Sequence, residues 1–279
     1  MRKRAFHQVD VFTRQPFLGN PLAVVNNALG LSDEQMQRFA AWTNLSETTF
    51  ILPPQSAHAD YRVRIFTPRG ELPFAGHPTL GTCHVWLESG GQPRNDKVVM
   101  QECGVGLVRI ALNGDQMAFS APALRRSGAL STEDLARACE ALRVPPSRVS
   151  HSQWVDNGAG WSVIMLKSVQ DVLSVQPDGD RIKGLKLGVC AWDANAPNTL
   201  EVRALFGSEQ GCQEDPVTGS LNAGIASWIF ASGMCKEPYE ARQGRLRGRD
   251  GRLRLYMDED QQVCVQGTCV SCIQGSVQI

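Results

Sequence analysis

Two ionisable side chains occur in matching patterns in the two halves of the sequence. His77 is followed by proline and then by Gly81, and Asp215 is followed by proline and by Gly219 at the same spacing. Proline fits the first position of a helix, where its missing N–H costs nothing, and Asp is favoured just before it. Each pattern therefore predicts a helix N-terminus led by an acid or a base. Two such ends facing one cleft would bind an anion, because helix dipoles and free backbone N–H groups favour negative charge.

Small residues and hydroxyl residues flank both patterns. Gly76, Gly219 and Ser220 would let a carboxylate approach the backbone N–H groups closely. Thr218 and Ser220 add hydroxyl donors, although the same hydroxyls can simply satisfy the first turn of a helix. A structural role stays open for Asp215 as well, because Asp is a standard N-cap.

Glu47 is a third candidate for chemistry. It lies between a predicted helix and a predicted strand at residues 48–52, beside apolar residues. Desolvation there would raise its pKa toward a value useful for general acid/base catalysis. The alternative is an ordinary solvated glutamate at a strand edge, which is the commoner situation for this residue type.

The elements that position these residues recur once in each half. Val63-Arg-Ile-Phe-Thr precedes the first pattern, and Val202-Arg-Ala-Leu-Phe precedes the second. This echo predicts an internal duplication with two α+β lobes, residues 1–121 and 122–279, in which the last strand can return to the N-terminal lobe. Residues 221–231 are apolar on most sides, and a short helix of this kind must be buried. We therefore expect a sheet curled around one central helix in each lobe.

Local signals identify two further helices. Ser32 is the predicted N-cap of one, and Gln35 completes a capping box ahead of apolar residues that share one face. Ser131 is the predicted N-cap of the other, which ends before the Pro145-Pro146 pair.

The composition excludes several classes of function. The sequence has 28 Lys and Arg residues and 28 Asp and Glu residues, so we expect neither a nucleic acid nor a membrane as a partner. The nine cysteines are an odd number without a signal peptide before them, which predicts reduced thiols and a cytoplasmic location. Cys264, Cys269 and Cys272 lack a fourth ligand at zinc spacing, and no nucleotide-binding glycine motif occurs. We therefore expect no metal and no cofactor.

At these residues the sequence resembles the PhzF-like (phenazine-biosynthesis-like) family, within the diaminopimelate-epimerase-type fold. The resemblance covers nearly the whole chain. It is carried by segments 9–13, 16–25, 46–50, 66–81 and 214–220, in the family's order and spacing.

The resemblance implies two similar lobes, each a curled sheet or barrel around a central helix, with the site between them. It also implies cofactor-independent isomerase chemistry and a homodimer. Matched by motif, Glu47 would be the proton shuttle, His77 and Asp215 would orient and polarise the substrate, and Gly76 and Ser220 would help to hold it.

The predicted function is therefore the movement of a proton on a small carboxylate substrate by Glu47, as in a dihydro-hydroxyanthranilate-type isomerisation. The resemblance does not identify the substrate itself. Two alternatives remain at this point: an amino-acid racemase or epimerase, and a non-catalytic protein that binds a small acid.

Overall fold

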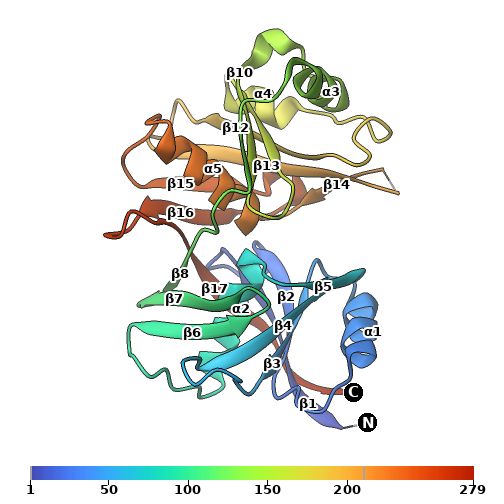
Figure 1. The fold of residues 1–279 in the computed structure, drawn as a ribbon. Helices are drawn as coiled ribbons and strands as arrows, with labels where there is room; N and C mark the ends of the chain where they lie inside the picture. Colours follow the sequence, from blue (N-terminus) through green and yellow to red (C-terminus); the bar gives the residue numbers. More distant parts are fainter. Residues whose placement is uncertain (1, 210) are drawn as a thin grey trace. The chain divides into compact units, whose positions relative to one another are not determined.

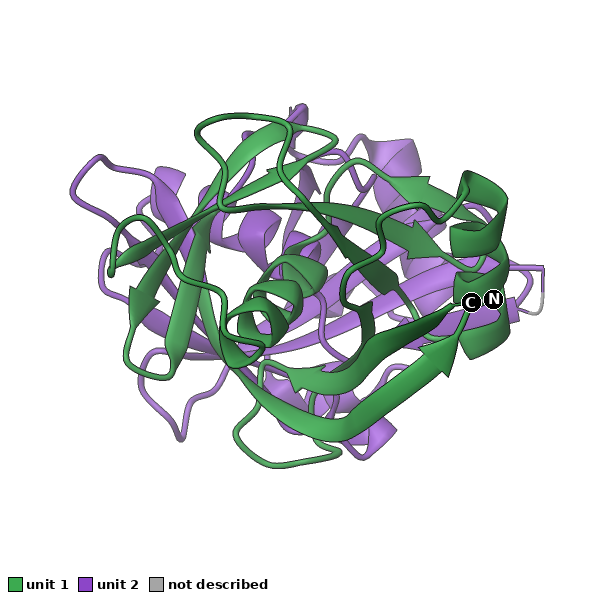
Figure 2. Ribbon diagram, turned by 90° about the horizontal axis from the view of Figure 1, so that it is seen from below, with its two compact units in different colours: residues 1–120, 266–279 green, residues 121–265 purple. Residues whose placement is uncertain are grey.

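The computed structural model describes residues 2–209 and 211–279, whose helices and strands are drawn in Figure 1. The chain divides into two compact units, which are coloured separately in Figure 2. Unit 1 comprises the chain up to Ser120 together with Gln266–Ile279, and unit 2 is Ala121–Val265. The last strand, β17 (Val263–Gln278), begins at the end of unit 2 and continues as part of unit 1.

Unit 1 is built mainly of strands, with two helices. Its elements are β1 (Lys3–Val11), β2 (Asn20–Val25), α1 (Asp33–Thr43), β3 (Thr48–Leu52), β4 (Tyr61–Thr67), β5 (Gly70–Leu72), α2 (Gly76–Glu88), β6 (Val98–Cys103), β7 (Gly106–Asn113), β8 (Gln116–Ser120) and most of β17.

The strand pairings of unit 1 close into a ring. In order around the ring the strands are β1, β2, β3, β4, β6, β7, β8 and β17, and β17 pairs again with β1. The β2–β3 and β4–β6 pairs are parallel, and β5 forms an antiparallel hairpin with β4. A closed ring leaves no free sheet edge, and its interior has room for one apolar element.

Helix α2 fills the interior of this ring. It contacts β1, β2, β3, β6 and β8, and most of its residues are buried. A side chain at Gly81 would overlap Leu22 on β2 and Val11 on β1, so the absence of a side chain there lets helix and strands approach closely. The predicted sheet curled around a central helix is confirmed in this unit.

Helix α1 packs against the outside of the ring and leads the chain to Glu47. Ser32 and Gln35 form the predicted capping box, so this prediction is confirmed. Met36, Phe39 and Ala40 pack with Phe50 and other apolar residues of β2, β3 and β4. The helix ends at Thr43, whose hydroxyl lies 2.9 Å from that of Thr48 on β3.

Unit 2 repeats this plan with additional helices. Its elements are β9 (Arg126–Gly128), α3 (Thr132–Leu142), the 3₁₀ turn Pro146–Arg148, β10 (Val149–Asp156), β11 (Ser162–Leu166), α4 (Val169–Ser174), β12 (Lys186–Trp192), β13 (Thr199–Ser208), β14 (Gly211–Asp215), α5 (Gly219–Ala231), β15 (Tyr239–Gln243), the 3₁₀ turn Arg245–Arg247 and β16 (Gly251–Met257).

The sheet of unit 2 curls around α5. Neighbouring strands pair in the order β9, β10, β11, β12, β13, β15 and β16, and β14 forms a hairpin with β13. Helix α5 contacts both β10 and β16, which lie near opposite ends of this order, so the sheet must wrap around it. Most residues of α5 are buried, which confirms the prediction that the segment at 221–231 is a buried helix.

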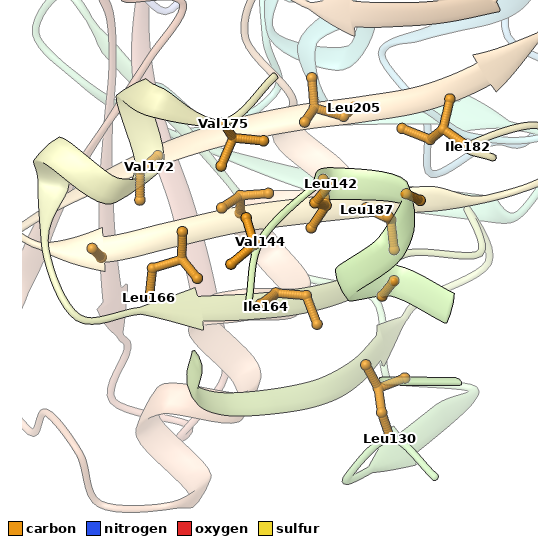
Figure 3. Close-up of a cluster of buried hydrophobic side chains, with 14 residues drawn as sticks. Leu130, Leu142, Val144, Ile164, Leu166, Val172, Val175, Ile182, Leu187 and Leu205 are labelled. Carbon is orange, nitrogen blue, oxygen red and sulfur yellow. The ribbon is translucent and has the colours of Figure 1, made fainter. Parts of the chain in front are cut away.

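The opposite face of the unit 2 sheet carries α3 and α4. Figure 3 shows their apolar side chains, among them Leu142 and Val172, packed against Ile164, Leu187 and Leu205 of the sheet. Ser131 caps α3 as the sequence predicts, with its hydroxyl accepting from the Asp134 N–H. Each sheet thus has one helix on its concave face and at least one helix on its convex face.

No helix in the described part of the chain combines the length and the apolar character needed to cross a membrane.

Candidate active site

Glu47 and His77 lie side by side in unit 1. Glu47 is the last residue before β3, and His77 is in the first turn of α2. Their side chains are 16% and 6% exposed, and Glu47 Oε2 is 3.5 Å from His77 Nε2. A carboxylate and an imidazole, brought together from different elements, are thus withdrawn from water beside the start of a buried helix.

His77 is a neutral ring. Its burial lowers the pKa of the imidazole from 6.5 to about 3. We assign the ring proton to Nε2, because Asn20 Nδ2 lies 3.4 Å from His77 Nδ1 and an amide nitrogen donates. The ring therefore presents an uncharged N–H toward Glu47.

The first helix starts earlier than the sequence predicts. Helix α2 begins at Gly76, and Ala75 is its N-cap without a side-chain hydrogen bond. The prediction that His77 caps this helix is wrong: His77 is the second helical residue and Pro78 the third. Proline is tolerated at either position, because none of the first N–H groups of a helix has an intrahelical partner.

The second helix starts later than the sequence predicts. Asp215 is the last residue of β14, and Thr218 is the N-cap of α5, which begins at Gly219. The predictions that Asp215 caps this helix and that Pro216 is its first residue are therefore wrong. Asp215 instead accepts a hydrogen bond of 2.5 Å at Oδ2 from the Thr218 hydroxyl. Asp215, Thr218 and Gly219 are thus joined in one tight turn.

Gln243 organises this turn, and the sequence predicted no role for it. Its Oε1 accepts from the Thr218 N–H at 3.0 Å and from Asn222 Nδ2 at 2.9 Å. Its Nε2 donates to the Asp215 carbonyl at 3.0 Å and to the Thr218 hydroxyl at 2.9 Å. Gln243 is buried, so these bonds hold the turn away from water.

Ser220 is fixed by two side chains from the β10–β11 region. Trp161 Nε1 donates to Ser220 Oγ at 3.1 Å, and Asn157 Nδ2 donates to the Ser220 carbonyl at 2.8 Å. Because its oxygen accepts from Trp161, the hydroxyl proton of Ser220 can be directed toward a ligand.

The structure aligns the internal repeat differently from the sequence patterns. Helices α2 and α5 both have 13 residues and begin at Gly76 and Gly219. Five residues into each helix stands a glycine, Gly81 or Gly224, whose added Cβ would lie within 2.6 Å of a neighbouring atom. Glu71-Leu-Pro-Phe-Ala-Gly76 therefore corresponds to Glu214-Asp-Pro-Val-Thr-Gly219.

This alignment separates the roles of the two ionisable residues. His77 corresponds to Ser220, and Asp215 corresponds to Leu72, so the prediction that His77 and Asp215 are equivalent is wrong. Each unit keeps the glycine at the helix start, and the chemistry-bearing residues around that glycine differ. Unit 1 assembles Glu47, His77 and Gly76, and unit 2 assembles Asp215, Thr218, Gly219 and Ser220.

The described residues contain no group of three or more His, Cys, Asp or Glu side chains arranged to hold a metal ion.

The fold is of the epimerase type. Solved epimerase and racemase structures share its two-lobe architecture. One is a predicted epimerase from Pseudomonas aeruginosa, with 25% sequence identity, a TM-score of 0.77 and 99% of each chain covered.

The chain belongs to the phenazine biosynthesis-like protein family, whose model matches residues 9–275. It is 35% identical to Antisense-enhancing sequence 1 of Schizosaccharomyces pombe, with 99% of each protein covered. It is 31% identical to an uncharacterised isomerase of Pasteurella multocida, with 96% of this chain and 91% of the relative covered. The chain is accordingly an enzyme of the isomerase class.

Proposed function

We propose that this isomerase moves a proton on a small carboxylate substrate without a cofactor, and that Glu47 is its general acid/base. The observation that carries the proposal is the pair formed by Glu47 and His77. A carboxylate and a neutral imidazole lie 3.5 Å apart, both withdrawn from water, at the N-terminus of a buried helix. Membership of a family with isomerase relatives supports the class of reaction.

In this proposal Glu47 removes a proton from a C–H bond that a neighbouring group has made acidic, and returns it to another carbon. One positioned acid/base contributes about 10²–10⁴-fold to such a rate. The remainder must come from donors that stabilise the enolate-like charge. A neutral His77 suits this task, because its Nε2–H donates a hydrogen bond and the ring gives up no proton of its own near neutral pH.

The substrate carboxylate is assigned to the helix starts. The N–H groups of Gly76 and His77 and those of Gly219 and Ser220 belong to first turns, where backbone donors lack helical partners. We propose that both sets, together with Asp215 and Thr218, bind the substrate. The repetition of the same glycine-led helix start in both units supports this assignment.

A cytoplasmic location and a homodimer complete the proposal. All nine cysteines are free thiols, which suits a reducing compartment. The proposed partner is a small acid, and neither nucleic acid nor membrane is invoked.

The test begins with a screen of small cyclic and amino-acid carboxylates by thermal shift, because a ligand that binds the folded state stabilises it. Each hit is then incubated with the enzyme in D₂O, and deuterium uptake at carbon is followed by NMR. Deuterium uptake with a shifted double bond supports the proposal. Uptake with inverted stereochemistry would indicate a racemase or epimerase instead, and tight binding without uptake would indicate a non-catalytic binder.

A further inference from the structure

A second duplicated feature lies just upstream of each central helix. In unit 1, Arg64 on β4 binds both carboxylate oxygens of Glu71 on β5, at 2.7 and 2.6 Å. In unit 2, Arg203 on β13 binds both oxygens of Glu214 on β14, at 3.0 and 2.9 Å. We call the Arg64–Glu71 and Arg203–Glu214 pairs the unit 1 clamp and the unit 2 clamp.

The two clamps have the same register. In each, the glutamate lies opposite the residue two positions beyond the arginine, which is Phe66 in unit 1 and Leu205 in unit 2. The unit 2 hairpin is longer, by an even number of residues on each strand. Because side chains alternate between faces with a period of two, this extension keeps arginine and glutamate on one face.

The same number of residues joins each clamp to the central helix of its unit. Glu71 precedes Gly76 by the same number of residues as Glu214 precedes Gly219. In unit 2 the next residue after the clamp is Asp215, which pairs across the strands with Ala204, the neighbour of Arg203. The clamp therefore acts on the end of β14 from which the Asp215 side chain projects.

Each arginine also binds a helix on the outside of its sheet. Arg64 donates to Asp33 in the first turn of α1, the helix that leads to Glu47. Arg203 Nη1 donates to the carbonyls of Val172 and Val175 at the end of α4, at 3.1 and 2.8 Å. In both units, one guanidinium thus joins a hairpin to an outer helix.

The two clamps differ in burial. The Arg203 and Glu214 side chains are 6% and 11% exposed, against 23% and 41% for Arg64 and Glu71. A planar, bidentate pair removed from water fixes both partners far more rigidly than a solvated pair does.

We propose that Arg203 is a positioning residue for the reaction, acting through Glu214 to fix Asp215 and the turn that follows it. This inference rests on the proposed function for its effect on turnover. The geometric part, that the clamp orders the Asp215–Gly219 turn, stands on its own.

The test uses the paired variant Arg203→Met/Glu214→Leu. Removing both charges together avoids a buried unpaired charge, so the variant is expected to fold. The control is Arg181→Met/Glu140→Leu, which removes an exposed ion pair in the same unit. Arg203→Lys is the conservative variant, because lysine keeps the positive charge and cannot form the bidentate contact with Glu214.

Two measurements separate positioning from general stability. The first is hydrogen exchange of the Thr218 amide, which donates to Gln243 in the turn. We expect exchange at least tenfold faster in the clamp variant, an intermediate rate in Arg203→Lys, and the wild-type rate in the control. The second is turnover of a substrate found by the carboxylate screen, where we expect kcat at least tenfold lower with KM within threefold.

The outcomes are distinct. Wild-type exchange at Thr218 in the folded clamp variant would overturn the inference, whatever the activity. Faster exchange with unchanged kcat would retain the ordering of the turn and overturn the role of Asp215 in turnover. If the wild-type protein turns over no carboxylate, the proposed function fails, and exchange at Thr218 still decides whether the clamp orders the turn.

Discussion

A buried neutral histidine makes the stability of this protein depend on pH in a defined way. His77 has a pKa of about 3 in the folded chain, against 6.5 for an ordinary histidine, because its ring is desolvated. As the pH falls below 6.5 the unfolded chain binds a proton at this ring, and the folded chain does not. The folded state therefore loses stability relative to the unfolded state throughout the window from pH 6.5 down to about 3.

The size of the effect follows from the two pKa values. One pKa unit corresponds to about 1.4 kcal/mol, so lowering the pH from 7 to 5 should cost about 2 kcal/mol of unfolding free energy through His77 alone. Well above pH 6.5 the ring is neutral in both states and contributes no pH dependence.

The assay compares urea unfolding of the wild type and His77→Gln at pH 7 and pH 5. Glutamine can still hydrogen-bond toward Asn20 and Glu47, and it does not titrate, so the pH-dependent loss should shrink by about 2 kcal/mol. The carboxylates remote from His77 have the same surroundings in both proteins, so their contributions cancel. The matched control is His58→Gln, at an exposed histidine, which should keep the wild-type loss. Equal losses in the wild type and His77→Gln would show that the native ring titrates normally, and would refute the neutral-donor role.

Two further predictions concern α5 and the turn before it. Gly224→Ala would place a Cβ 2.3 Å from the Val155 carbonyl oxygen, whereas the Cβ of Gly81→Ala would meet only the ends of side chains. Gly224→Ala should therefore lower the urea midpoint more than Gly81→Ala does, by roughly 1–3 kcal/mol in unfolding free energy. Equal midpoints would contradict the enclosure of α5 by the sheet. Gln243→Leu would leave the Thr218 N–H and the Asp215 carbonyl without their partner, at about 1–3 kcal/mol for each buried group. We expect it to lower both stability and turnover, and a fully active, equally stable variant would show that this glutamine does not organise the site.

The parts of the fold that the sequence predicts well are those set by local signals. The capping box of Ser32 and Gln35 fixes the start of α1, because both partners lie within one turn. The apolar residues at 221–231 predict the buried helix, since a short helix without a polar face has no stable place at the surface. Because a short apolar helix must be buried, the sequence also predicts a sheet that curls around it.

The helix starts were harder to predict because several residues can serve as a cap. Asp215 and Thr218 are both good N-cap residues, and the local sequence does not choose between them. The choice depends on Gln243, which lies 25 residues from Thr218 in the sequence and binds its N–H. The error in the helix start carried over into the repeat alignment.

The partners of the predicted site residues were also beyond local signals. Asn20 lies 57 residues from His77, and their contact exists only once β2 and α2 have packed together. Nothing in the residues around His77 identifies this partner or the tautomer that it selects. The arginine and glutamate of each clamp can be read in the sequence. That the two clamps share one register follows only from the strand pairing.

The most direct test of the account is deuterium uptake from D₂O into a carboxylate ligand by Glu47→Gln. Glutamine keeps the shape and hydrogen-bonding capacity of Glu47 and cannot accept a proton from carbon. We predict that the variant binds the ligand with an affinity close to that of the wild type and loses at least about 10²-fold in the rate of uptake. Glu133→Gln, at an exposed position on α3, should retain the wild-type rate. Uptake at the wild-type rate by Glu47→Gln would contradict the assignment of Glu47 as the proton-moving group.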